Sequence, residues 1–179
     1  MQPADVVLNT GEFHFTHEPI RISTVLGSCV AFTAWHPYRR IGGLCHYLLP
    51  VGPAPDGMNR SPRGMYALGA AGLFEDAFRS AGTHVGEYVI KMFGGGNMFP
   101  QQLGERVCEF VCAPDAPPTA CRDVACKNVT QGREIFESRG FAIQVEDVGG
   151  VGSRQLIFDV ATGDVWVRRG RFTPNTVPQ

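Results

Sequence analysis

The sequence contains little that points to a membrane or to nucleic acid. No hydrophobic run approaches the roughly 20 residues that a membrane-spanning helix needs, and residues 1–19 have neither the basic nor the apolar segment of a secretory signal. The formal net charge is −1, so we expect no basic surface for nucleic acid or anionic lipid. These absences predict a soluble, cytoplasmic protein without membrane insertion and without a nucleic-acid partner.

Extended helical stretches are also scarce. The 179 residues include 22 glycines and 13 prolines, which favours many turns and short strands over a helical bundle. A hydrophobic content of 44% is enough to bury one core in a chain of this length. We therefore predict a single domain over residues 1–171, followed by a disordered tail over residues 172–179.

The cysteines do not form a recognisable disulfide or metal pattern. In the reducing compartment expected here, free thiols are the default for the six cysteines. Zinc sites usually contain closer C-x2-C pairs than the spacings in the C-terminal cluster. We therefore expect no metal and no cofactor. The cluster consists of Cys108, Cys112, Cys121 and Cys126.

A run of three glycines, 94–96, follows a short β-rich segment over Tyr88 to Phe93. No Gly-Lys-Ser/Thr follows it, so a phosphate-binding loop is a poor interpretation. Glycine leaves room for close approach of the backbone to another strand or to a ligand. We therefore expect this segment to approach another strand or a ligand closely.

Two apolar runs, Val30 to Trp35 and Ile41 to Leu49, flank a polar segment that contains a proline, which predicts a β-hairpin. If the turn centres near residues 37 and 38, Cys29 and His46 face each other across the hairpin. Directly opposed side chains have Cβ atoms roughly 4.5–5.5 Å apart. The hairpin therefore predicts a nucleophile and its base.

The residues before Cys29 support this interpretation. Gly27 and Ser28 allow a tight turn whose backbone N–H groups can polarise a carbonyl oxygen. A hydroxyl of Ser23 or Thr24 can orient the imidazole if their strand runs beside His46. The alternative is that Cys29 is a small buried hydrophobe and that the histidine is an ordinary core residue.

The remaining pattern predicts two helices and several further strands. One helix is expected from about Pro62 to Ser80, with Ser61 as N-cap and Gly82 as its end. A second is expected from about Val129 to Arg139, capped by Asn128. Further strands are expected at residues 6–15, 20–26, 141–145, 154–159 and 164–168. This strand-rich pattern predicts an α+β fold with two layers of strands and helices on one side.

Three other segments were weighed for function. The Pro- and Gly-rich residues 51–64 are long enough to form a loop over an active site. The acidic pair Glu146 and Asp147 is interpreted as turn-forming carboxylates rather than acid–base machinery. No conformation is predicted for residues 101–122, which are rich in cysteine and proline.

Several motifs together resemble the CheD family of chemoreceptor glutamine deamidases. They are TVLGSCVAF, HPYRRIGGLCHYLLP, KMFGGGNMF and VEDVGGVGSRQLIFDVATGDVWVRR, and the resemblance runs from about residue 8 to residue 170. It implies a three-layer α/β/β sandwich, with Cys29 as nucleophile and His46 as base. The glycine run corresponds to the family's F-G-G-x-N-M motif, which implies that it lines the active site, with Gly95 on the substrate side and Asn97 as a substrate-side or structural amide. In the family a threonine five or six residues before the cysteine completes the triad, so the third position is Thr24 or Ser23. Residues 101–122 are longer than the family pattern.

The resemblance also implies a reaction and partners. A Cys29 thiolate, formed by proton transfer to His46, attacks the carboxamide of a receptor glutamine, and the γ-glutamyl thioester is hydrolysed to glutamate. The same groups can hydrolyse a glutamate methyl ester. Methyl-accepting chemotaxis receptors are the implied substrates, and a CheC-type phosphatase is a common partner. Two other classes stay open, a non-catalytic regulator that binds receptor or phosphatase, and a cysteine hydrolase of other specificity.

Overall fold

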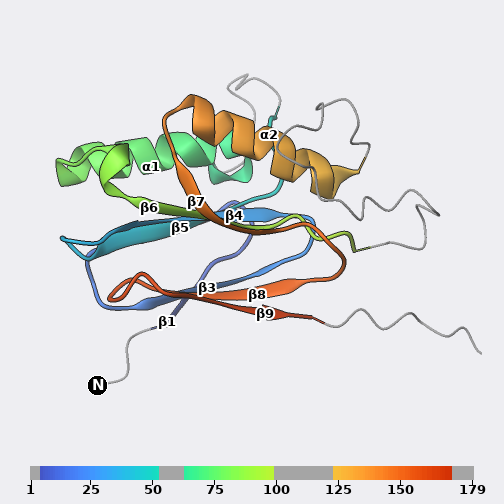
Figure 1. Ribbon diagram of the computed structural model, residues 1–179, viewed down its shortest axis with the longest axis horizontal. Coiled ribbons are helices and arrows are strands. Elements are labelled where there is room, and N and C mark those ends of the chain that lie inside the picture. The colour runs from blue at the N-terminus through green and yellow to red at the C-terminus, as the bar shows by residue number, and fades with distance from the viewer. Residues whose placement is uncertain (1–4, 53–62, 99–122, 171–179) are drawn as a thin grey trace, which may run out of the picture.

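The computed structural model describes residues 5–52, 63–98 and 123–170. Two β-sheets are stacked face to face, and two α-helices cover one outer face of the stack (Figure 1). The predicted α+β, three-layer α/β/β sandwich is therefore confirmed. Within the described ranges, no helix is long and apolar enough to cross a membrane.

The two sheets differ in size and connectivity. The four-stranded sheet has the order β1 (Asp5–Val7), β3 (Arg21–Leu26), β8 (Arg154–Asp159), β9 (Val165–Arg169). The five-stranded sheet has the order β2 (Phe13–Thr16), β5 (Ile41–Tyr47), β4 (Val30–His36), β6 (Val89–Gly94), β7 (Ile143–Val148). Most neighbouring strands are antiparallel, but β1 with β3 and β6 with β7 are parallel.

The helices begin elsewhere than the sequence predicts. Helix α1 covers Ala67–Ala81, after the short 3-10 helix η1 (Arg63–Met65), and its N-cap residue Tyr66 makes no side-chain cap bond. Ser61 and Pro62, the predicted start, lie outside the described residues. The predicted end is confirmed, because Gly82 adopts the left-handed conformation with φ of 64°. A second 3-10 helix, η2 (Val85–Glu87), leads into β6.

Helix α2 covers Val124–Ser138, so it starts five residues before the predicted position. The predicted cap at Asn128 is wrong. The side chain of Asp123 caps the helix by accepting a hydrogen bond from the Ala125 N–H, and Asn128 lies within the helix, fully buried. The Asn128 side chain instead contacts the carbonyl oxygens of Ser28 and Leu48. Asp123 stands directly before the helix, where a carboxylate can accept from a free backbone N–H group.

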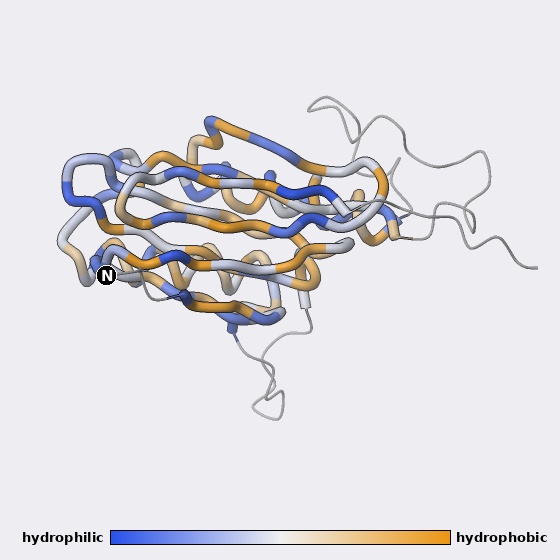
Figure 2. Tube along the Cα trace, turned by 90° about the horizontal axis from the view of Figure 1, so that it is seen from below, coloured by the Kyte–Doolittle hydropathy of each residue, from blue (hydrophilic) through white to orange (hydrophobic). Residues whose placement is uncertain are grey.

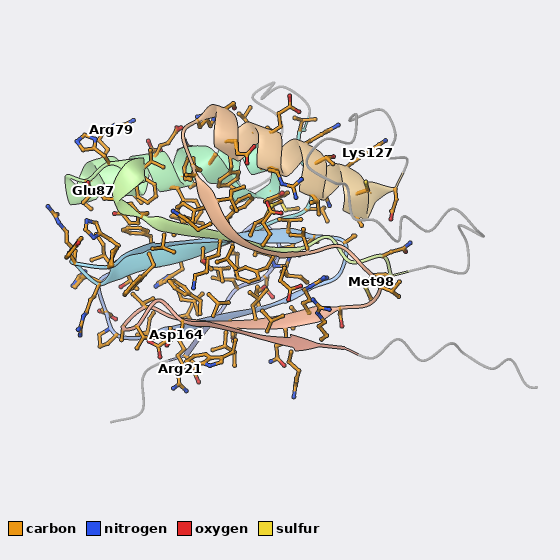
Figure 3. The ribbon with its side chains drawn as sticks, viewed as in Figure 1. Arg21, Arg79, Glu87, Met98, Lys127 and Asp164 are labelled. Atoms are coloured by element: carbon orange, nitrogen blue, oxygen red, sulfur yellow. The ribbon has the colours of Figure 1, made fainter. Side chains whose placement is uncertain are left out.

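Hydrophobic side chains fill both interlayer spaces (Figure 3). The helices are anchored by aromatic contacts, of which the closest stacks Phe136 of α2 on Phe32 of β4 with ring centroids 3.6 Å apart. Hydrophobic and hydrophilic residues alternate along the strands of the four-stranded sheet (Figure 2), as expected when one face packs inward and one faces solvent. The inner core of the two sheets comprises Leu8, Ile20, Ile22, Leu26, Ala31, Leu44, Phe93, Leu156, Phe158 and Val160.

The predicted hairpin is confirmed as β4 and β5, but its register is two residues from the prediction. Ala31 pairs with His46, and Val30 pairs with Tyr47. Cys29 precedes the first residue of β4 and therefore lies diagonally from His46 rather than opposite it. The turn centres between Tyr38 and Arg39, and Arg40 takes a positive φ of 51°.

The cysteine prediction is wrong at one position. Cys29 and Cys45 are free, whereas Cys126 near the start of α2 is disulfide-bonded. Several other predictions concern residues outside the described ranges. These are the cysteines Cys108, Cys112 and Cys121, most of the loop over residues 51–64, the segment 101–122 and the tail 172–179.

Candidate active site

The turn that carries Cys29 takes the chain from one sheet to the other. Strand β3 ends at Leu26 in the four-stranded sheet, and β4 begins at Val30 in the five-stranded sheet. Residues 27–29 form the corner between them. Since β3 and β5 belong to facing layers, their inward side chains meet behind this corner. Cys29 is partly buried and packs against the inter-sheet core.

His46 is held in one orientation by Thr24. The two side chains come from facing sheets, are 3% and 2% exposed, and join through a 2.8 Å hydrogen bond between His46 Nδ1 and Thr24 Oγ1. The Thr24 hydroxyl donates its single proton to the Leu8 carbonyl oxygen at 2.8 Å, so it must accept from His46. Nδ1 therefore carries the ring proton, and Nε2 of the neutral ring has a free lone pair.

Ser23 does not reach this histidine. Adjacent residues of a strand point to opposite faces of the sheet, and β3 alternates between exposed and buried positions with Thr24 on the buried side. Ser23 stands on the outer face, opposite Ile157 of β8. Between the two hydroxyls left open by the sequence, the one that contacts the imidazole is that of Thr24.

Thr10 is a polar contact of the site that sequence reasoning missed. Its Oγ1 lies 3.3 Å from His46 Nε2, and its hydroxyl is near enough to the Cys29 side chain to lower the pKa of that thiol against the effect of burial. In the described part of the chain, no hydrogen bond joins Cys29 directly to His46. No motif marks Thr10, because it lies in the loop between β1 and β2, far from the cysteine in sequence.

Burial favours the neutral forms of Cys29 and His46. Burial raises the pKa of Cys29, and the hydrogen bond from Thr10 only partly opposes this. Burial lowers the pKa of His46 to about 4, and the nearby Glu12 carboxylate only partly offsets it. A thiol with a raised pKa and an imidazole with a lowered pKa do not form a stable thiolate–imidazolium pair.

The glycine run holds the Cys29 turn by its backbone. Gly95 N–H donates to the Cys29 carbonyl oxygen at 2.8 Å, and Gly96 N–H donates to Gly27 O at 2.9 Å. A Cβ on Gly94 would lie 2.3 Å from the Cys29 carbonyl oxygen. The prediction of close backbone approach is therefore confirmed, and the partner is the turn itself.

The other predicted substrate-side groups lie around the same corner. Asn97 is buried, and its backbone pairs with residues 150 and 152. Met98, at the end of the molecule where β6 leaves the sheet (Figure 3), packs beside Gly27. Among the described residues, the backbone N–H groups of Ser28 and Cys29 donate to no carbonyl of another residue.

Asn128 connects helix α2 to the site. Its Nδ2 donates to the Ser28 carbonyl oxygen and to the Leu48 carbonyl oxygen, both at 2.8 Å. The first lies directly before Cys29, and the second lies two residues after His46. One side chain therefore fixes the spacing of the two segments that carry Cys29 and His46. Sequence reasoning assigned Asn128 to the helix cap and missed this bridge.

The acidic pair near residue 147 takes no part in the site. Asp147 forms ion pairs with Arg154 at 2.9 Å and Arg169 at 2.8 Å, and Glu146 pairs with Arg133. Arg154, Arg169 and their hydrogen bonds lower the pKa of Asp147 against the effect of burial. These carboxylates have a structural role, as predicted. They fill it by forming ion pairs with arginines, not by stabilising a turn as the sequence suggested. Within the described ranges, no cluster of three metal-ligating side chains occurs.

Comparison with known proteins shows the family. The family model described as CheD chemotactic sensory transduction matches residues 48–169. The chain belongs to the CheD family. The matched segment begins after His46, but pairwise similarity to other members extends over the site.

Three curated relatives illustrate this family membership. The probable chemoreceptor glutamine deamidase CheD 3 of Dechloromonas aromatica is 42% identical over 163 residues, which cover 91% of this chain and 86% of the relative. The probable chemoreceptor glutamine deamidase CheD of Pseudomonas syringae pv. syringae is 38% identical, with 92% and 84% covered. The corresponding CheD 1 of Leptospira interrogans is 32% identical, with 94% and 95% covered.

A solved structure shares a weaker likeness. The Bacillus licheniformis hypothetical protein YfiH is similar at a TM-score of 0.44 and 13% identity, covering 75% of this chain and 49% of that chain. This is too distant a likeness to support a functional conclusion.

Proposed function

We propose that this CheD-family protein deamidates specific glutamines of methyl-accepting chemotaxis receptors, with Cys29 as nucleophile. The observation that carries the proposal is the inter-sheet hydrogen bond that sets the tautomer of His46, with Nε2 free on the side of Thr10 and Cys29. Curated relatives over nine-tenths of the chain are named chemoreceptor glutamine deamidases. A protein-glutamine glutaminase needs a thiol, a base of this kind and an acceptor for the oxyanion.

The reaction follows from this arrangement. As Cys29 Sγ attacks the glutamine carboxamide carbon, its proton passes to the site base His46, and the N–H groups of Ser28 and Cys29 bind the oxyanion. The imidazolium returns the proton to the departing ammonia, which leaves a γ-glutamyl thioester. His46 then takes a proton from water as the water oxygen attacks the thioester carbon. The carbon–sulfur bond breaks and His46 returns the proton to Sγ, which releases glutamate and regenerates the Cys29 thiol. The same steps hydrolyse a glutamate methyl ester, with methanol as leaving group.

Receptor helices as substrates imply further partners and a location. An enzyme that modifies the cytoplasmic helices of receptors acts in the cytoplasm. A CheC-type phosphatase partner rests on the family resemblance alone, and binding of purified CheC-type protein measured by calorimetry tests it.

Mass spectrometry of a receptor cytoplasmic fragment tests the proposal. The wild-type protein should add the mass change of deamidation to specific glutamines, and Cys29→Ala should add none. Cys45→Ala is the matched control, because Cys45 is a free cysteine in the helix-side core, away from Cys29. A fragment carrying glutamate methyl esters separates esterase from amidase activity.

Two outcomes would redirect the proposal. If the folded wild-type protein leaves a fragment of its own organism's receptor unchanged but binds it, the protein is a non-catalytic regulator. If a peptide panel shows backbone cleavage instead of side-chain deamidation, the protein is a cysteine hydrolase of other specificity.

A further inference from the structure

Backbone hydrogen bonds hold Thr10 beside Cys29 and His46. Two hydrogen bonds tie its loop to His46: Gly11 N–H donates to the His46 carbonyl oxygen at 2.6 Å, and the His46 N–H donates to Glu12 O at 3.1 Å. These bonds extend the pairing of β2 with β5. The hydroxyl of Thr10 is therefore positioned by the same strand that carries the imidazole.

The direction of each hydrogen bond follows from the proton count. His46 Nδ1 carries the ring proton because the Thr24 hydroxyl donates to Leu8. Nε2 then has only a lone pair to offer, so the bond at 3.3 Å must be donated by the Thr10 hydroxyl. While Cys29 is a thiol, the Thr10 proton is directed at Nε2, and the Thr10 oxygen has lone pairs left to accept the S–H. Once the sulfur is ionised, the hydroxyl donates to it instead, and this interaction partly opposes the rise in the Cys29 pKa that burial causes.

We propose that Thr10 is a further catalytic group, which passes the proton of Cys29 to His46. The Cys29 S–H bond breaks as its proton binds Thr10 Oγ1, and the Thr10 O–H bond breaks as that proton binds Nε2. The hydroxyl is neutral before and after the transfer. The negative charge is left on sulfur, where the same hydroxyl then donates to it. The effect of this proton transfer on turnover rests on the proposed deamidase function. The effect of Thr10 on the pKa of the Cys29 thiol does not.

Three observations favour this assignment over a purely structural role. Thr10 Oγ1 lies 3.3 Å from His46 Nε2, and its hydroxyl is close enough to Cys29 to influence the pKa of the thiol. No hydrogen bond in the described part of the chain joins Cys29 to His46 directly. The ring is oriented so that its free lone pair faces Thr10. A threonine present only for packing would need none of these. The methyl group supplies the packing, so valine separates the two roles.

The first test compares Thr10→Val with Thr10→Ser. Proton transfer by a positioned group contributes roughly 10²–10⁴-fold, so Thr10→Val should lower kcat by at least about 10-fold with little change in KM. Thr10→Ser should restore most of kcat. The control is Thr16→Val, because Thr16 is also partly buried, on β2, and among the described residues its hydroxyl accepts a hydrogen bond from the Glu18 N–H and makes none with Cys29 or His46. Unchanged kcat in Thr10→Val, or equal losses in the serine and valine variants, would overturn the proposal.

The second test does not depend on the natural substrate. Alkylation of Cys29 by iodoacetamide, followed by mass spectrometry of its peptide over a range of pH, reports the pKa of the thiol. Because the hydroxyl donates to the thiolate, Thr10→Val should raise this pKa further, and Thr10→Ser should not. Equal pKa values in wild type and Thr10→Val would refute the proton path even if deamidation is observed. A raised value in Thr10→Val with no deamidation by any variant would refute the receptor substrate and leave the proton path standing.

Discussion

Thr24 Oγ1 and His46 Nδ1 are 2.8 Å apart, and the two residues belong to different sheets. The hydrogen bond therefore depends on how the sheets are stacked, not only on the local conformation of either strand. It fixes the tautomer of a buried imidazole and leaves Nε2 as the basic atom.

Replacement of Thr24 should impair catalysis more than replacement of its neighbour. Thr24→Val leaves His46 Nδ1–H and the Leu8 carbonyl without their partner, which should lower stability by about 1–3 kcal/mol and kcat by roughly 10²-fold. Ser23→Ala is the matched control, since Ser23 lies on the outer face of the same strand, and it should retain activity. Urea unfolding and deamidation rates measure both effects. A larger loss of activity in Ser23→Ala than in Thr24→Val would contradict the assignment.

The stability of the protein should fall in mild acid because of His46. Burial lowers its pKa in the folded state to about 4, below the value of about 6.5 for an exposed histidine. Between pH 6.5 and 4 the unfolded chain therefore binds a proton that the folded chain does not. Stability contributed by neutral His46 is complete above pH 6.5 and decreases by up to about 3 kcal/mol as the pH falls to 4.

Urea unfolding at pH 7 and pH 5 measures this dependence. His46→Gln should lose part of the pH dependence, and His17→Gln should keep it, since His17 is exposed. Identical pH dependence in wild type and His46→Gln would refute the effect. If His46 is the base, activity should also persist at pH 5.5, where an ordinary histidine is largely protonated.

Loss of the Asn128 amide should disorganise the site from the helix side. Asn128→Asp removes the donor to Ser28 O and Leu48 O and places a carboxylate, fully buried, beside two carbonyl oxygens. We expect destabilisation of roughly 3 kcal/mol or more and a lower kcat. Glu134→Ala on the exposed side of α2 is the control. Thermal unfolding and deamidation rates check both, and wild-type values in Asn128→Asp would show that the bridge is dispensable.

The third glycine of the run should be intolerant of alanine in this protein. A Cβ on Gly96 would lie 2.1 Å from the Gly152 carbonyl oxygen, so the segment that contacts Gly27 would have to shift. Gly96→Ala should lower the free energy of unfolding by about 1–3 kcal/mol. Gly86→Ala is the control, because nothing lies within 4 Å of its Cβ, and it should be neutral or slightly stabilising. A neutral Gly96→Ala in urea unfolding would show that the Gly152 segment yields without cost.

The prediction from sequence succeeded where short-range patterns carry the information. Apolar runs around a proline-containing turn specified the β4–β5 hairpin, and a glycine run specified close backbone approach. The hairpin register failed by two residues because the turn residues 36–40 allow more than one turn centre. Since the side-chain period of a strand is two residues, this error kept Cys29 and His46 on one face while changing their spacing.

By itself, the sequence determined the α+β class, the position of the Cys29 turn and the two residue types suited to nucleophile and base. Only the tertiary structure decided between Ser23 and Thr24, because strand alternation and sheet stacking together select the hydroxyl that meets His46. Only the tertiary structure brought Thr10 and Asn128 to the site. Their contacts join segments that are far apart in the chain. A local sequence pattern such as strand alternation cannot predict which distant segments come together in the fold.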